Sequence, residues 1–309
     1  MLAQEVQDRI KMTDGFELFY RRWKAAGEVQ NVIVCVHGLG VSSEFFGNLG
    51  EALSMDGIDV CALDLRGFGN SVEPGLARGD TTSFKRHLQD LNEAVTFIHQ
   101  AHPAKKVFML GHSLGCSYAL WYAANHPDSL HGLILAAPTI QYSTRAPAAL
   151  VIKGLLFLLF SPKRKLYGDR TMPETYRKSQ EYKLISEDPL NAKGESARYI
   201  IRGVGPLQNG VLKNASRTRT PTLIIQGEAD IHVLPQGAKK LFEGLAAEDK
   251  TLKTFPDADH RFYHLIFPKA DFQDDPAKRK QVTEAVSDWI KRPINLTQTP
   301  SKTKEFNKL

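Results

Sequence analysis

Cysteine is scarce in this sequence of 309 residues, which has only Cys35, Cys61 and Cys116. Each of the three lies within or beside an apolar run, and their spacing matches neither a disulfide framework nor a set of metal ligands. The sequence therefore argues against a small secreted fold held together by disulfide bonds. We expect all three cysteines to be reduced core residues of an intracellular protein.

A secretory leader and a membrane-spanning run are also missing. The first ten residues contain acidic side chains and have no apolar central region, which a signal peptide would need. The most apolar run, residues 148–160, would extend about 20 Å as a helix, whereas crossing a bilayer takes roughly 20 residues. These absences predict a cytoplasmic protein.

Positive charge is concentrated in one part of the chain. The formal net charge is +6, but residues 139–215 hold 13 Lys or Arg against 6 Asp or Glu, which leaves the remainder close to neutral. The same segment contains the most apolar run. This pairing is more typical of peripheral contact with an anionic membrane than of a groove that reads bases, so we expect no nucleic-acid partner.

A strand, a sharp turn and a helix are predicted around Ser113. Residues 107–110 are apolar, Gly111 and Gly115 flank the serine in a G-x-S-x-G pattern, and a helical pattern begins at once. A plain glycine turn is the alternative. A strand before the pattern and a helix after it favour a nucleophile, because this turn lifts the serine hydroxyl above the sheet.

Strand and helix patterns alternate along most of the chain. An alternating strand is predicted at 15–23, buried strands at 32–36, 58–63 and 221–227, and further strands at 130–136 and 251–255. Helical patterns occupy 45–55, 82–98 and 283–290. This succession predicts an α/β fold with a mainly parallel sheet and with active groups at the carboxyl ends of its strands.

Backbone amides at two places are candidates for an oxyanion hole. His37-Gly38-Leu39-Gly40 follows a buried strand, and its glycines let the backbone approach a ligand closely. A glycine turn without function is the alternative. Together with the residue after the nucleophile, this loop would supply the N–H groups of Leu39 and Leu114.

The partners of a nucleophilic serine lie on later loops. Asp230 follows the strand at 221–227, and His260 follows the strand at 251–255. The order serine, acid, histidine suits a triad in which the acid orients the base. Glu228 is the rival acid, and His264, one helical turn after His260, is the rival base.

Other polar residues near these motifs are interpreted as structural. Asp64 and Arg66 lie in a glycine-rich turn, where an aspartate commonly caps backbone N–H groups. An acid catalyst and an anion clamp are the less favoured alternative for this pair. The remaining histidines, including His37 and His112, are expected to be neighbours of the site.

The strand pattern disappears between residues 139 and 215. The apolar run at 148–160 is predicted to be a helix, and we favour a core helix of a cap domain over an exposed surface-binding element, although one helix could serve in both ways. Lys163, Arg164 and Lys165 follow it, where cations suit a helix C-terminus or lipid phosphates.

These motifs together resemble the α/β-hydrolase superfamily, within it the monoacylglycerol lipase and lysophospholipase branch. The resemblance is carried by HGLG at His37, DLRGFGNS at Asp64, GHSLG around Ser113, DPL at Asp188, QGEAD ending at Asp230 and TLKTFPDADH ending at His260. It implies an eight-stranded, mostly parallel sheet flanked by helices. The core would comprise 1–138 and 216–292, a helical cap 139–215, and a flexible tail 293–309.

The resemblance also implies the chemistry. Ser113 would be the nucleophile, His260 the base and then the acid, and Asp230 the orienting acid, with Leu39 and Leu114 as oxyanion donors and no cofactor or metal. We expect a serine hydrolase that cleaves lipid-like esters, such as monoacylglycerols or lysophospholipids, through an acyl-enzyme intermediate. A non-lipid carboxylesterase, an amidase or peptidase of the same fold, and a ligand receptor with little turnover stay open as alternatives.

Overall fold

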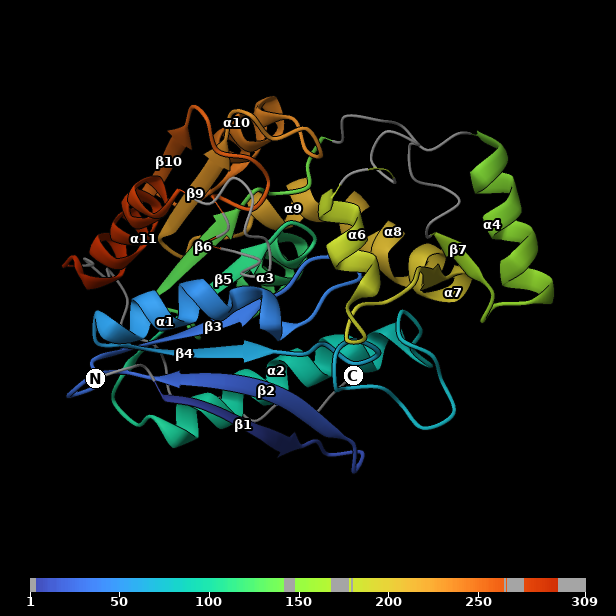
Figure 1. Ribbon diagram of the computed structural model, residues 1–309, viewed down its shortest axis with the longest axis horizontal. Helices are drawn as coiled ribbons and strands as arrows, with labels where there is room; N and C mark the ends of the chain where they lie inside the picture. Colours follow the sequence, from blue (N-terminus) through green and yellow to red (C-terminus); the bar gives the residue numbers. More distant parts are fainter. Residues whose placement is uncertain are drawn as a thin grey trace.

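A twisted eight-stranded sheet forms the centre of the protein (Figure 1). The computed structural model describes residues 4–141, 148–167, 178, 180–263, 265 and 275–293. The strand order is β1-β2-β4-β3-β5-β6-β9-β10, and every neighbouring pair from β4 to β10 is parallel. The strands are β1 (Gln4–Lys11), β2 (Glu17–Lys24), β3 (Asn31–Val36), β4 (Ile58–Leu63), β5 (Lys106–His112), β6 (Gly132–Ala136), β9 (Thr222–Gly227) and β10 (Lys250–Phe255). The predicted mostly parallel sheet of eight strands is confirmed.

Helices cover both faces of the sheet because its central strands are apolar on both sides. Along β3, Val34 and Val36 belong to one core cluster, whereas Ile33 and Cys35 belong to the other. The first cluster is completed by α2 (Phe84–Ala101), α3 (Gly115–Asn125), α9 (Val211–Ala215) and α10 (Pro235–Gly244). The second is completed by η1 (Ser43–Phe46), α1 (Gly47–Met55) and α11 (Pro276–Lys291). The period-2 alternation of a strand thus divides the core into two layers.

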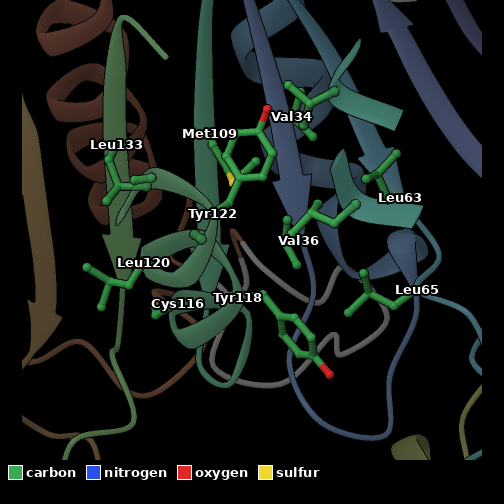
Figure 2. Packing of buried hydrophobic residues seen from close by; sticks show 14 of the residues in the cluster. Val34, Val36, Leu63, Leu65, Met109, Cys116, Tyr118, Leu120, Tyr122 and Leu133 are labelled. Carbon is green, nitrogen blue, oxygen red and sulfur yellow. The ribbon is translucent and has the colours of Figure 1, made fainter. Parts of the chain in front are cut away.

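The first core cluster fixes the helix that follows Ser113. Figure 2 shows Val34 and Val36 of β3 and Met109 of β5 on the same side of the sheet as Tyr118 and Leu120 of α3. All five side chains are buried. Burial of this much apolar surface holds α3 firmly against the sheet, so the turn between β5 and α3 has a fixed position.

Several short elements lie between β6 and β9, and we call this segment the insertion. Its parts are α4 (Ala148–Phe160), β7 (Lys165–Tyr167), α6 (Gln180–Glu187), β8 (Glu195–Ser196), α7 (Ala197–Tyr199), the π-helix η3 (Ile200–Val204), α8 (Gly205–Asn209) and α9. Much of it lies beyond the end of the sheet toward which the β4 arrow points (Figure 1). The short antiparallel pair β7–β8 corrects the expectation that strands are absent here; strands of two or three residues are too short to leave a periodic pattern.

The helix α4 has the predicted bounds, but the favoured interpretation of it as a core helix is wrong. Gly154 is its one buried residue, while Leu159 is 74% and Phe160 80% exposed. A helix that is apolar all round is normally buried. In this protein, the side of α4 that contains Gly154 packs on Leu166 and Ile201, and most of the other residues of the helix face outward.

Two elements near the ends of the described chain differ from the prediction: one strand was not predicted, and one helix begins earlier than predicted. The edge strand β1 pairs with β2, and its side chains are mostly exposed, so no apolar alternation revealed it. The helix α11 begins at Pro276, where the Asp275 side chain caps the Lys278 amide, earlier than the predicted start at 283. Residues 294–309 of the predicted tail lie outside the described residues, and the boundaries of the three predicted units stay predictions.

The three cysteines are buried and unpaired, as the sequence predicted. Burial raises the pKa of Cys61 to about 12 and raises the pKa values of Cys35 and Cys116 further above the ordinary range. Their thiolates are therefore suppressed at neutral pH. Within the described ranges, no helix has both the length and the apolar character to span a membrane.

Truncation of Phe108 should test the second core layer. Phe108 on β5 is fully buried, and its ring centroid lies 6.1 Å from that of Trp289 on α11. We expect Phe108→Ala to lower the free energy of unfolding by about 3–5 kcal/mol, because it removes buried contacts and leaves a cavity. Urea unfolding should reveal less than half of that loss for the matched variant Phe97→Ala, because Phe97 is 38% exposed. Equal losses would contradict the proposed layer.

Candidate active site

Ser113 occupies a strained turn between β5 and α3. Its φ of 55° lies in the left-handed region, which is unfavourable for a residue with a side chain. A Cβ at Gly111 would lie 2.4 Å from the carbonyl oxygen of Gly115. A Cβ at Gly115 would lie 2.1 Å from the carbonyl oxygen of Val36. Both glycines are therefore required, and the close packing aims the serine side chain away from the sheet.

The loop after β3 packs directly against this turn. A Cβ at Gly38 would lie 3.1 Å from the Ser113 Cβ. His37 Nε2 accepts a hydrogen bond from the Leu65 amide (3.1 Å), so its Nδ1 carries the proton and donates to the Gly38 carbonyl (2.8 Å). Across the described part of the chain, neither the N–H of Leu39 nor that of Leu114 has a hydrogen-bond acceptor. Both amides are available to a ligand oxygen.

Asp64 and Arg66 lie in the structural network that the sequence predicted for them. The Asp64 carboxylate accepts hydrogen bonds from the amides of Ser43 (2.6 Å) and Asn70 (2.7 Å). The buried Arg66 guanidinium binds both carboxylate oxygens of Asp90. These contacts hold the turn after β4 beside the His37 loop.

His260 and Asp230 meet although they come from different loops. His260 Nδ1 lies 2.7 Å from Asp230 Oδ2, while Asp230 Oδ1 accepts hydrogen bonds from the amides of His232 (2.8 Å) and Val233 (3.0 Å). Burial alone would raise the pKa of Asp230, but the hydrogen bonds from His260 and the two amides lower it. Asp230 is therefore ionised at neutral pH, and its rival Glu228 is exposed.

His112 links the turn at Ser113 to His260. Its Nε2–H donates to the His260 carbonyl (2.9 Å), and the two ring centroids are 4.8 Å apart. Burial, together with nearby His260, lowers the pKa of His112 to about 3, so the ring is neutral. Among the described residues, no hydrogen bond joins the Ser113 hydroxyl to the His260 ring. In enzymes, a hydrogen bond of this kind commonly shortens only when substrate is bound. His264 lies outside the described residues.

A hydrogen-bonded chain also connects Ser113 to the insertion. Gln208 of α8 donates from Nε2 to the Thr139 hydroxyl (2.7 Å), which lies 3.5 Å from the Ser113 carbonyl. Sequence reasoning missed Thr139, Gln208 and the contact made by His112. For His112, its position next to Ser113 was the available signal. Thr139 and Gln208 come together only through the fold.

The part of the chain that the structure describes contains no cluster of three or more His, Cys, Asp or Glu side chains that could hold a metal ion. What the site presents is a serine hydroxyl, an imidazole paired with a carboxylate, and free backbone amides. A serine on a left-handed turn after the central strand of a mostly parallel sheet defines an α/β hydrolase.

Comparisons with known proteins specify the family. A family model described as serine aminopeptidase, S33, matches residues 27–264, and the chain belongs to this family. The monoglyceride lipase of Rattus norvegicus is 27% identical over 282 residues, which are 91% of this chain and 89% of the relative.

Solved structures give the same classification. A monoacylglycerol lipase from Paleococcus ferrophilus has a TM-score of 0.72 and 27% identity, with 89% of this chain and 98% of that chain covered. A soluble variant of the Saccharomyces cerevisiae monoglyceride lipase, in complex with a substrate analog, also has a TM-score of 0.72, with 22% identity and 94% and 96% coverage. The resemblance inferred from the motifs is confirmed.

The strain at Ser113 has a measurable consequence. Ser113→Gly should relieve the left-handed strain, whereas Ser113→Ala removes the hydroxyl but keeps a Cβ at φ 55°. We expect the glycine variant to exceed the alanine variant in free energy of unfolding by about 1 kcal/mol. Urea denaturation of the two variants measures this difference, and a less stable glycine variant would refute it.

Proposed function

We propose that the protein is a carboxylic ester hydrolase in which Ser113, His260 and Asp230 form a catalytic triad. The observation that carries the proposal is the 2.7 Å contact between His260 Nδ1 and the ionised Asp230, on a loop held to the nucleophile turn by His112. A carboxylate on one ring nitrogen leaves Nε2 unprotonated and able to take the serine proton. A protein that only bound its ligand would not need this arrangement.

Catalysis proceeds through an acyl-enzyme. His260 Nε2 removes the proton of Ser113 as Oγ attacks the ester carbonyl, and the tetrahedral oxyanion receives hydrogen bonds from the amides of Leu39 and Leu114. The oxyanion collapses, and the alcohol leaves with the proton from His260. Water, deprotonated by the same imidazole, then attacks the acyl-enzyme, and the acid is released as Ser113 regains its proton. No step requires a metal or an organic cofactor.

Lipid-like monoesters are the proposed substrates. The similarity to monoglyceride lipases over about nine-tenths of the chain supports this class, and the family description, serine aminopeptidase, keeps an amide substrate as the second candidate. Hydrolysis rates measured across acyl lengths and head groups, with aminoacyl arylamides in parallel, decide between them. Faster arylamide cleavage would overturn the ester assignment.

Replacement of the triad residues gives the direct test. A fluorophosphonate probe should label the wild type and fail to label Ser113→Ala. Asp230→Asn should lower kcat by about 10⁴-fold because the imidazole loses its ionised partner, while the matched Glu228→Gln variant should stay close to wild type. Equal labelling of the wild type and Ser113→Ala would refute the nucleophile, and equal losses at Asp230 and Glu228 would refute the assignment of the acid.

The insertion is proposed to act as a lid, residues 139–215, that contacts anionic membranes through α4. The outward residues of α4 are Val151, Ile152, Leu155, Leu156, Leu159 and Phe160. Exposed basic side chains lie beside this apolar face, at Lys153 and at residues 163–165. An apolar face next to cations is suited to a surface of acyl chains and lipid phosphates. We accordingly propose a cytoplasmic protein with peripheral membrane contact.

Sedimentation with vesicles tests the membrane contact. Neutralisation of Lys163, Arg164 and Lys165 to Gln should weaken binding to phosphatidylserine vesicles at least about tenfold, since each cation near such a surface contributes roughly 1 kcal/mol. The matched control is Lys239→Gln with Lys240→Gln, two exposed lysines on α10. Equal binding by both variants would exclude α4 and its cations from the membrane contact.

A further inference from the structure

A buried carboxyl group of the insertion lies against the oxyanion loop. Glu195 of β8 is 4% exposed, and its Oε1 is 2.9 Å from the position that a Cβ at Gly40 would occupy. The Ala192 amide of the same segment donates to the Gly40 carbonyl (2.7 Å). Gly40 itself has a φ of +76°. The residue after Leu39 is therefore enclosed by the insertion on two sides.

Within the described ranges, no cation forms an ion pair with the carboxyl group of Glu195. Lys165 of β7 is the cation that acts on it, but Lys165 is exposed and its ammonium donates to the Lys193 carbonyl (2.9 Å). Tyr199 of α7, a second titratable neighbour, is hydrogen-bonded to Tyr118 (2.9 Å). Burial accordingly raises the pKa of Glu195 to about 8.

Asp80 and Arg198, two charged residues that adjoin β8, are already paired with each other. Asp80, in the loop before α2, accepts hydrogen bonds from the Ser196 hydroxyl (2.6 Å) and from the Arg198 guanidinium (2.6 Å). The Ser196 amide donates to the Gly79 carbonyl (2.9 Å). Because side chains alternate along a strand, Ser196 faces Asp80 while Glu195 faces Gly40. Arg198 is thus not available to neutralise Glu195.

We propose that Glu195 is a positioning residue that packs against Gly40, holds it in its left-handed conformation and so keeps the Leu39 amide directed at the reacting carbonyl. This inference rests on the proposed function, since it assigns a task to the same oxyanion hole. It goes beyond that function by assigning a positioning role to a residue of the insertion that contacts no substrate.

Ionisation of Glu195 opposes catalysis for an electrostatic reason. Gly40 is two residues from Gly38, which touches Ser113, so the carboxyl group lies within roughly 12 Å of the developing oxyanion. A carboxylate at that distance in a poorly solvated region repels the oxyanion. The reactant ester is uncharged, so the repulsion affects the transition state and not substrate binding.

The pH dependence of monoacylglycerol hydrolysis tests the proposal. In the wild type, kcat should fall roughly tenfold between pH 7 and pH 9.5, with an apparent pKa near 8 and little change in KM. Glu195→Gln, an uncharged isostere, should keep the pH 7 rate and lose this decline. The matched Glu187→Gln variant, at an exposed position on α6, should reproduce the wild-type profile.

A second variant tests the positioning role itself. Glu195→Ala leaves Gly40 without its packing partner, so it should lower kcat at every pH while KM changes little. A decline that persists in Glu195→Gln, or a folded Glu195→Ala with wild-type kcat, would overturn the proposal. Hydrolysis retained by Ser113→Ala would instead refute the proposed function, so the two failures are distinguishable.

Discussion

The backbone contact between the end of β3 and the start of α3 is the constraint on which the site depends. Gly115 approaches the Val36 carbonyl so closely that a Cβ would lie 2.1 Å from it. Ser113, two residues before Gly115, lies in the left-handed region, and the loop after β3 packs against it. Ser113 and both candidate oxyanion amides are therefore fixed by the packing of one helix on one strand, before the side chains of Asp230 and His260 are considered.

The charge balance around His260 follows from burial. His112 and His232 both lie within ring-contact distance of His260, with centroids 4.8 and 5.2 Å away. Burial lowers the pKa of His112 to about 3 and that of His232 to about 4. Neither of these neighbouring rings therefore adds positive charge beside His260, whose Nδ1 lies 2.7 Å from the Asp230 carboxylate.

Much of the fold was predictable because its central strands are buried on both faces and leave continuous apolar runs. The order β3, β4, β5, β6, β9 and the turn at Ser113 follow from such runs and from glycine spacing, whereas β10 is only partly buried. The edge strand β1 was missed because it buries little surface, and the pair β7–β8 because it is too short for a periodic signal. The prediction that α4 is a core helix was wrong because composition alone does not decide whether other elements pack over an apolar helix.

The candidate site was predictable to the level of motifs but not of contacts. The positions of Ser113, Asp230 and His260 after their strands could be inferred from the order of elements. The sequence could not distinguish Asp230 from Glu228 by geometry, since a shift of two residues along a loop turns one carboxylate toward His260 and the other outward. Nor could it bring Gln208 or Glu195 to the site, because both reach it through the insertion.

The burial of all three cysteines has a practical consequence. A thiol-directed dye or spin label reacts with an exposed thiolate, and none of the native positions offers one at neutral pH. The natural sequence can thus serve as its own unreactive background. A single cysteine introduced on α4 would carry a fluorophore or nitroxide at one known place, which makes the surroundings of this helix accessible to spectroscopy without prior replacement of native residues.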